Sequence, residues 1–191
     1  MENIFDINVE EHKAVLSKMA VLNEDVNVVA TLMADTVLAG GTIFLCGNGG
    51  SAADCQHIAA EFMGRFLLDR DPISSLALTT DTSALTCISN DYNYDDVFAR
   101  QLVGLGKAND CLIGISTSGD SRNVLKAIGV GNSIGMSTVG LLGRDGGEIA
   151  SLCKSNIIIP SNSTARVQEM HILIGHTLVG MVEELVTGAY S

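Results

Sequence analysis

Residues 44–62 read FLCGNGGSAADCQHIAAEF, which predicts a buried strand, a tight glycine-rich turn and a helix in succession. The apolar run before Gly47 suits a strand, and the small residues after it let the backbone turn sharply. This order of elements is typical of phosphate-binding loops in α/β proteins. The turn lacks the lysine of a nucleotide P-loop and does not fit the G-x-G-x-x-G pattern of dinucleotide-binding turns. We therefore expect a ligand that carries a phosphate but is not a nucleotide.

Further apolar runs continue this pattern toward the C-terminus. Strands buried in a parallel sheet read as nearly continuous apolar runs, and helices between them must cover both faces. The sequence therefore predicts an α/β fold, a three-layer αβα sandwich with a five-stranded parallel sheet. The expected strands are residues 42–46, 74–79, 111–116, 137–143 and 156–160. The expected helices follow the opening turn and then cover residues 82–88, 94–105, 121–131 and 164–186.

The N-terminal part of the chain shows helical periodicity over residues 9–38 but no strand pattern. Asn23–Asp25 is expected to divide this stretch into two helices, with Asp25 as the N-cap of the second. A glycine pair then ends the second helix. We expect residues 1–40 to form a helical segment that packs on the main domain or on a neighbouring subunit. Residues 41–191 are expected to form a single α/β domain.

The composition argues against several kinds of partner. The chain has 191 residues, 47% of them apolar, a mean hydropathy of +0.32 and a formal net charge of −11. The negative charge disfavours a basic surface, so we expect no nucleic-acid partner. An uninterrupted apolar run of about 18 residues is absent from the sequence, so we expect no contact with a membrane through a spanning helix. The apolar excess instead suggests an interface between subunits.

The cysteines and the N-terminal sequence bear on the compartment. The five cysteines, at positions 46, 55, 87, 111 and 153, form no C-x-x-C pair. This spacing is typical of free thiols in a reducing compartment. The first residues, MENIFDINVEEHK, are acidic and lack the apolar core of a signal peptide. We therefore expect a cytoplasmic protein.

A second polar turn, ISTSGDS at residues 115–121, follows the third expected strand. The carboxyl ends of parallel strands lie at one edge of a sheet, so both turns should present helix N-termini and hydroxyls there. Ordinary tight turns with capping serines are the alternative, but two such turns at matching positions favour a phosphate site. The candidate ligands are Asn48, Gly49, Gly50, Ser51, Ser116, Thr117, Ser118 and Ser121.

The two turns together resemble the sugar isomerase (SIS) superfamily, whose members bind phosphosugars. Three further stretches, TDTSALTCISNDY, ISTSGDSRNVLKAI and TARVQEMHILIGHTLVGMVEE, are similar to those of the phosphoheptose isomerases. The similarity runs from about residue 12 to residue 186 and keeps the order of the motifs. It implies the SIS fold, a flavodoxin-like or Rossmann-like sheet.

The resemblance also implies an activity. Phosphoheptose isomerases are aldose–ketose isomerases that convert D-sedoheptulose 7-phosphate to D-glycero-D-manno-heptose 7-phosphate through an enediol(ate). Their product enters heptose biosynthesis for lipopolysaccharide, capsule or other surface glycans. Isomerisation of a different phosphosugar would change the substrate but keep the class of reaction.

Four polar residues on two expected helices could perform chemistry. His57 and Glu61 are spaced i, i+4, about 40° apart on one helical face. Gln168 and His176 are spaced i, i+8, about 80° apart, whereas His171 lies about 140° from His176. From spacing alone, His57 and Glu61 could equally form a surface ion pair, and His176 could be a core histidine among apolar neighbours.

The resemblance assigns these residues to one site. It implies that His57, Glu61, Gln168 and His176 bind one Zn²⁺ per subunit. It further implies that Glu61 and His176 are the acid/base pair, and that Glu61 and Gln168 also contact the substrate. Direct ligation of zinc by Glu61 would compete with its action as a free base, so we rank the acid/base role first.

The sequence leaves the roles of several other polar residues open. Asn90 and Asp91 lie in an expected polar loop after the helix at 82–88, and the resemblance implies contacts with substrate hydroxyls. An Asx-type turn is the alternative. Arg65 and Arg166 could bind phosphate or form structural ion pairs; we favour the structural role for Arg65 and leave Arg166 open. Ala165 replaces an aspartate that some members carry, which questions any mechanism that needs that carboxylate.

A non-catalytic SIS regulator, such as the bacterial proteins that associate with the replication initiator, is the alternative function. Such regulators lack the acidic residue at Glu61 and the histidine at His176, and this chain has both. The enzyme is therefore favoured. The resemblance also implies a homotetramer with N- and C-terminal helices in a central bundle and with sites lined by more than one subunit.

Overall fold

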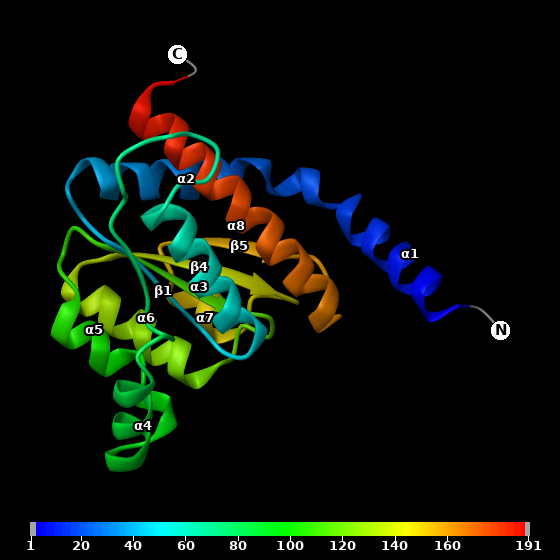
Figure 1. Ribbon diagram of the computed structural model, residues 1–191. Coiled ribbons are helices and arrows are strands. Elements are labelled where there is room, and N and C mark those ends of the chain that lie inside the picture. The colour runs from blue at the N-terminus through cyan, green and yellow to red at the C-terminus, as the bar shows by residue number, and fades with distance from the viewer. Residues whose placement is uncertain (1–2, 190–191) are drawn as a thin grey trace.

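The computed structural model describes residues 3–189, and within them it contains one five-stranded sheet in which all strands run parallel (Figure 1). The strand order is β2-β1-β3-β4-β5, so the predicted five-stranded parallel sheet is confirmed. The strands are β1 (Ile43–Gly47), β2 (Ser75–Ala77), β3 (Cys111–Ser116), β4 (Ser137–Gly143) and β5 (Ser155–Ile159).

The order of the strands creates one crevice. The chain passes from β1 outward to β2 and then returns to the opposite side of β1 as β3. The connections therefore diverge between β1 and β3, which pair in register with Gly47 opposite Ile115. In open α/β sheets ligands bind at the carboxyl ends of the strands that flank such a switch point.

Alternate strand residues point into two separate cores, as the pleat of a strand requires. Leu45 and Ile113 belong to one core, whereas Phe44 and Leu112 belong to the other. The first core lies under α2 (Asn23–Leu38), α3 (Gly50–Met63) and α8 (Thr164–Thr187) (Figure 1). The second lies under α5 (Ala99–Leu105), α6 (Arg122–Ile134) and α7 (Gly147–Leu152). The predicted three-layer sandwich is thus confirmed.

Several boundaries differ from those expected. The helix expected at 82–88 is α4 (Thr82–Asp91), so Asn90 and Asp91 end a helix instead of lying in a loop. The helix expected at 94–105 is divided into the 3₁₀ turn η2 (Tyr94–Asp96) and α5, because the Asn93 side chain accepts a hydrogen bond from Asp95 N and starts a new turn. The six-residue helix α7 was not predicted, since it is too short for a periodic pattern.

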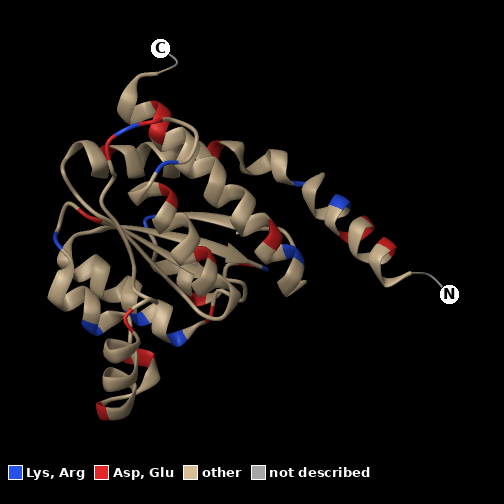
Figure 2. Ribbon diagram, in the orientation of Figure 1, with Lys and Arg blue, Asp and Glu red and all other residues tan. Residues whose placement is uncertain are grey.

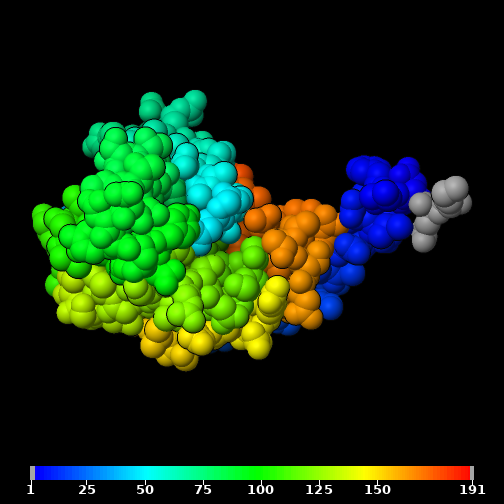
Figure 3. All heavy atoms as spheres, turned by 90° about the horizontal axis from the view of Figure 1, so that it is seen from below, coloured from blue at the N-terminus to red at the C-terminus, as the bar shows by residue number. Residues whose placement is uncertain are grey.

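The N-terminal segment contains α1 (Ile4–Leu16) and the 3₁₀ turn η1 (Met19–Leu22) before α2. Helix α2 begins at Asn23, so the prediction of Asp25 as its N-cap was wrong. Helix α1 projects from the body of the protein, beside the N-terminal part of α8 (Figures 1 and 3). The division into residues 1–40 and 41–191 remains a prediction.

Arg166 fastens α1 to α8. Its side chain is 8% exposed and donates to Asn8 O at 2.7 Å and to Glu169 Oε1 at 2.6 Å. Glu169 also bonds to His12 Nδ1 at 2.8 Å. The sequence left the role of Arg166 open, and these contacts show that the role is structural in this chain.

The surface is predominantly acidic. Figure 2 shows Asp and Glu residues on α1, on α8 and on several loops, with fewer Lys and Arg residues among them. Among the helices that the structure describes, none combines the length and apolarity needed to cross a bilayer.

His171 fixes α8 against the end of β4. Its ring is fully buried, and Nε2 lies 3.1 Å from Leu142 O. Burial lowers the pKa of His171 to about 4, although the bond to Leu142 opposes this shift. Helix α8 therefore carries a histidine that stays neutral at physiological pH and can donate to the β4 carbonyl.

The pKa of His171 predicts a pH-dependent stability. The unfolded chain binds the proton at a pKa of about 6.5 and the folded chain only near 4. The stabilisation is therefore complete above pH 6.5 and falls as the pH drops toward 4, by about 3 kcal/mol in total. Urea unfolding of the wild type and of His171→Gln between pH 4 and 7 should show this difference in slope. Parallel curves for the two proteins would contradict the assignment.

Candidate active site

The two polar turns predicted from the sequence lie side by side. One follows β1 and leads into α3 at Gly50, and the other follows β3 and leads into α6 at Arg122. Asn48 in the first turn and Asn123 in the first turn of α6 exchange two side-chain hydrogen bonds, both 2.8 Å long. The N-termini of α3 and α6 therefore lie together at the switch point, where their free N–H groups can bind an anion.

Two glycines shape the first turn. Gly49 has φ +56, a conformation that residues with a side chain rarely adopt. A Cβ on Gly50 would lie 2.6 Å from Nε2 of Gln168, so the side chain of Gln168 on α8 packs directly on the start of α3. The structure thus brings Gln168 to the expected phosphate loop.

Hydroxyl groups organise the second turn. Ser116 is buried, and its Oγ lies 3.0 Å from Oγ of Ser121 and accepts a hydrogen bond from Gly119 N. Ser118 Oγ accepts from Asp120 N at 3.1 Å and lies 3.4 Å from Ser116 Oγ. Thr117, between these serines, is half-buried. Ser51, on the other turn, is buried at the start of α3.

His57, Glu61 and His176 form a compact cluster between α3 and α8. His57 Nε2 lies 2.9 Å from His176 Nε2 and 3.4 Å from Glu61 Oε1. One ligand atom from each of the three residues lies within 4.8 Å of the others. The ring of Phe66 stacks on His176 with centroids 5.3 Å apart and planes 1° from parallel. The cluster can bind a divalent metal or move a proton, and His176 is no core histidine.

Asp54 is a further carboxylate beside this cluster that the sequence interpretation missed. Burial raises the pKa of Asp54, whereas His57 and His176 oppose the shift. Its Oδ2 is buried and accepts no hydrogen bond from the described residues. The i−3 spacing from His57 places both on one face of α3, and this spacing could have indicated Asp54.

A buried ion pair between Arg70 and Glu183 contacts the backbone of the cluster. The fully buried carboxylate of Glu183 accepts hydrogen bonds from the backbone N–H groups of Phe66, Leu67 and Leu68 and from Arg70 Nε. Burial alone would raise the pKa of Glu183, but these four donors outweigh it and hold the pKa below its usual value. Arg70 also donates to Glu61 O at 3.0 Å. The pair thus ties the backbone of Glu61 to the segment that presents Phe66.

Asn90 and Asp91 lie apart from these contacts. Both are exposed at the end of α4, and Asn90 Nδ2 donates to Asp91 Oδ1 at 2.8 Å. Within residues 3–189 neither forms a hydrogen bond with the two turns, so their role as substrate ligands remains a prediction. Arg65 is exposed and makes no ion pair with any described residue, which leaves its favoured structural role without support.

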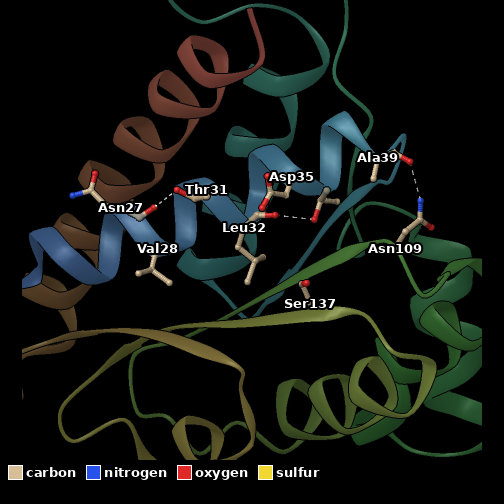
Figure 4. Close-up of a pocket in the computed structure, with 9 residues that line it drawn as sticks. Asn27, Val28, Thr31, Leu32, Asp35, Ala39, Asn109 and Ser137 are labelled. Atoms are coloured by element: carbon tan, nitrogen blue, oxygen red, sulfur yellow. Dashed lines mark hydrogen bonds between the residues drawn. The ribbon is translucent and has the colours of Figure 1, made fainter. Parts of the chain in front are cut away.

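A hollow with a volume of about 620 Å³ lies elsewhere, along α2 and next to Asn109 and Ser137 (Figure 4). In its lining, Asn109 precedes β3 and Ser137 begins β4. The hollow therefore lies at the amino ends of the strands, opposite the two turns. It combines no acid with a base, and we do not assign the chemistry to it.

The fold and the two turns define the class of protein. Residues 9–143, well over half of the chain, match the family model for the SIS domain. The sheet order and the paired turns described above are thus those of a SIS-domain protein.

Full-length relatives narrow the class. The chain is 46% identical over 184 residues to the phosphoheptose isomerase of Campylobacter jejuni serotype O:6, covering 96% of this chain and 99% of that protein. It is 51% identical over 173 residues to the phosphoheptose isomerase of Helicobacter pylori strain Shi470, covering 90% of each. The structure of the phosphoheptose isomerase from Neisseria gonorrhoeae matches with a TM-score of 0.90 at 41% identity, covering 94% of this chain and 97% of that one. The chain belongs to the phosphoheptose isomerase family, which confirms the resemblance seen in the sequence.

Proposed function

We propose that this chain is an aldose–ketose isomerase that converts D-sedoheptulose 7-phosphate to D-glycero-D-manno-heptose 7-phosphate. The observation that carries the proposal is the cluster of Glu61 and His176 around His57, in a chain of the phosphoheptose isomerase family. The neighbouring edge of the sheet offers two turns suited to a phosphate. A non-catalytic regulator would have no use for an acid/base pair at this place.

The phosphate of the substrate binds between the two turns. Backbone N–H groups at Gly49, Gly50 and Ser51 and the hydroxyls of Ser116, Thr117, Ser118 and Ser121 supply neutral donors. The positive ends of the α3 and α6 dipoles favour the negative charge without a lysine. Gln168, which packs on Gly50, is placed to contact the sugar next to the phosphate.

Glu61 and His176 perform the proton transfers. Glu61 removes the proton from C1 while His176 protonates the oxygen on C2, which gives the enediol. Glu61 then returns its proton to C2 while the hydroxyl at C1 gives up its proton to His176, which gives the aldose. Each group ends in the protonation state in which it began, as a catalytic cycle requires. Asn90 and Asp91 are proposed to contact hydroxyls of the substrate.

The residues present also fit a zinc ion. Two imidazoles and a carboxylate are ligands that Zn²⁺ prefers, and one ligand atom from each of these three residues lies within 4.8 Å of the others. His57, His176, Gln168 and Glu61 would hold one ion per subunit. When bound, zinc would stabilise the negative charge that develops on the enediolate oxygens. Glu61 as the base and His176 as the acid must each be free of the ion while they transfer a proton, because a lone pair that binds a metal cannot also hold a proton.

Metal titration tests this zinc site. Protein freed of metal by a chelator should bind one Zn²⁺ per chain in calorimetry, and His57→Ala should weaken binding by at least about 100-fold because a direct ligand is lost. His12→Ala, which removes a histidine at the α1–α8 contact, is the matched control and should bind as the wild type does. Equal affinity of all three proteins would exclude the site.

The assembly and the compartment are also proposed. Ile4 and Phe5 on α1 are 75% and 70% exposed, which supports burial of this helix between subunits of a homotetramer. The five free thiols support a cytoplasmic location. The product would enter heptose biosynthesis for lipopolysaccharide, capsule or other surface glycans.

The assay for the proposed function follows the aldose. Purified protein, with and without added Zn²⁺, is incubated with sedoheptulose 7-phosphate, and D-glycero-D-manno-heptose 7-phosphate is measured. We expect turnover. If neither preparation turns the ketose over, while the same protein binds sedoheptulose 7-phosphate in calorimetry, the regulator is the correct alternative.

A further inference from the structure

Three side chains from three separate segments meet beside the first phosphate turn. Asn48 follows β1, Asn123 lies in the first turn of α6, and Tyr94 begins η2. Asn48 and Asn123 exchange two hydrogen bonds of 2.8 Å, and the Tyr94 hydroxyl donates to Asn48 Oδ1 at 3.1 Å. Asn123 is only 3% exposed, whereas Tyr94 is 56% exposed.

These bonds use most of the hydrogen-bonding capacity of the Asn48 side chain. Its Oδ1 accepts from both Asn123 Nδ2 and Tyr94, which occupies the two lone pairs of the oxygen. Its Nδ2 donates one of its two hydrogens to Asn123 Oδ1. The side chain of Asn48 therefore ties parts of the protein together, and its oxygen is not available to a ligand. What Asn48 can still offer is one amide hydrogen and its backbone N–H.

The segment that carries Tyr94 is held by contacts of residues before and after it. Asp96, two residues later, pairs with Lys126 on α6 at 2.9 Å, and Arg100 stacks over the ring of Tyr92 with 3.8 Å to the centroid. The same segment follows directly after α4, which ends with Asn90 and Asp91. Tyr94 is thus the hydrogen-bonded link between that segment and the phosphate turn.

We propose that Tyr94 and Asn123 are positioning residues for phosphate binding. Asn123 holds the GNGGS turn against the start of α6, and Tyr94 in η2 holds the same turn through a second hydrogen bond. As a result, the backbone N–H groups of both turns converge on one phosphate. The proposal rests on the proposed function insofar as that function places the phosphate at these turns. Within residues 3–189, neither side chain is hydrogen-bonded to Glu61, His57 or His176.

The proposal predicts a loss of affinity without a loss of chemistry. Tyr94→Phe removes one hydrogen bond to a half-buried oxygen and should weaken phosphate binding by about 2- to 10-fold. Asn123→Ala leaves Asn48 Nδ2 without its partner and Asn48 Oδ1 with Tyr94 alone, and should weaken phosphate binding by about 5- to 100-fold. The KM for sedoheptulose 7-phosphate should rise in parallel, and kcat should stay within about 3-fold because the acid/base pair is untouched.

The test measures inorganic phosphate binding by calorimetry, together with kcat, KM and thermal unfolding. Tyr92→Phe removes a hydroxyl from the same segment, and Asn109→Ala removes an amide at the opposite edge of the sheet; both controls should bind phosphate as the wild type does. In an Asn48→Ala background, Tyr94→Phe should have no further effect, since both act through Asn48. The exposed position of Tyr94 keeps the test valid even if Asn123→Ala does not fold.

The outcomes separate this proposal from the proposed function. If the wild type binds phosphate and Tyr94→Phe binds it equally well, or if Tyr94→Phe lowers kcat at unchanged affinity, the positioning role is wrong. A wild type that binds phosphate but does not isomerise the ketose overturns the proposed function alone, because the affinity series still decides the positioning role. A wild type that isomerises the ketose but binds no inorganic phosphate overturns the positioning role alone.

Discussion

Replacing Glu61 by Gln should lower kcat for sedoheptulose 7-phosphate by about 10²- to 10⁴-fold, the usual contribution of a general base. An amide has nearly the shape of the carboxylate but cannot accept a proton from carbon. The Glu61 side chain is 24% exposed and makes one contact of 3.4 Å with His57, so the fold should survive the change. Initial rates of aldose formation, with thermal unfolding beside them, measure the effect.

Glu24→Gln is the matched control for Glu61→Gln. Glu24 is an exposed carboxylate in the first turn of α2, and it is not part of the cluster of His57, Glu61 and His176. It should keep wild-type kcat. The zinc content of each protein must be measured too, so that a lost metal is not mistaken for a lost base. Wild-type kcat in Glu61→Gln at equal metal content would remove Glu61 from the chemistry.

Replacing Glu183 by Ala should lower the free energy of unfolding by about 3–5 kcal/mol, because a buried ion pair is broken from one side. The exposed fractions of the Arg70 and Glu183 side chains are 4% and 0%. Without the carboxylate, Arg70 keeps a buried charge and three backbone N–H groups at residues 66–68 lose their acceptor. Urea unfolding at pH 7 measures the loss.

Two variants separate the charge of Glu183 from its shape. Glu183→Gln keeps the volume and one acceptor oxygen, and should lose less stability than Glu183→Ala. The double variant Arg70→Ala/Glu183→Ala should be more stable than the sum of the single losses predicts, because no unpaired charge remains. Strictly additive losses, or a loss below about 1 kcal/mol in Glu183→Ala, would show that the pair contributes little.

The sequence was sufficient for the sheet because each strand is a separate apolar run bounded by a turn. Residues 111–116 and 137–143 are nearly uniformly apolar, and both form the strands expected there. The paired turns could be predicted for the same reason, since parallel strands must end at one edge. The helix predicted at 82–88 extends in the structure to Asp91. Its last residues include Asn90 and Asp91, polar residues that are typical of turns, so the pattern does not indicate this extension.

The site was harder to predict, because its contacts join residues distant along the chain. The spacing of His57 and Glu61 fits an ion pair as well as a metal site, and only the packing of α8 on α3 brings His176 to within 2.9 Å of His57. Tyr94 lies outside the quoted motifs, and Asn123 lies within ISTSGDSRNVLKAI with nothing in that stretch to indicate its contact with Asn48. Their bonds to Asn48 span 46 and 75 residues of sequence, and no local pattern encodes them.

The most direct test of the central claim is isomerisation in D₂O, followed by NMR. Sedoheptulose 7-phosphate is incubated with the wild type and with His176→Ala, and deuterium at C2 of the aldose is measured. Proton transfer through an enediol predicts that the wild type forms the aldose and that part of it carries solvent deuterium at C2, while His176→Ala does so about 10²- to 10⁴-fold more slowly. An aldose formed at the same rate by both proteins would contradict the assigned acid/base pair, and no aldose from the zinc-loaded wild type would contradict the isomerase itself.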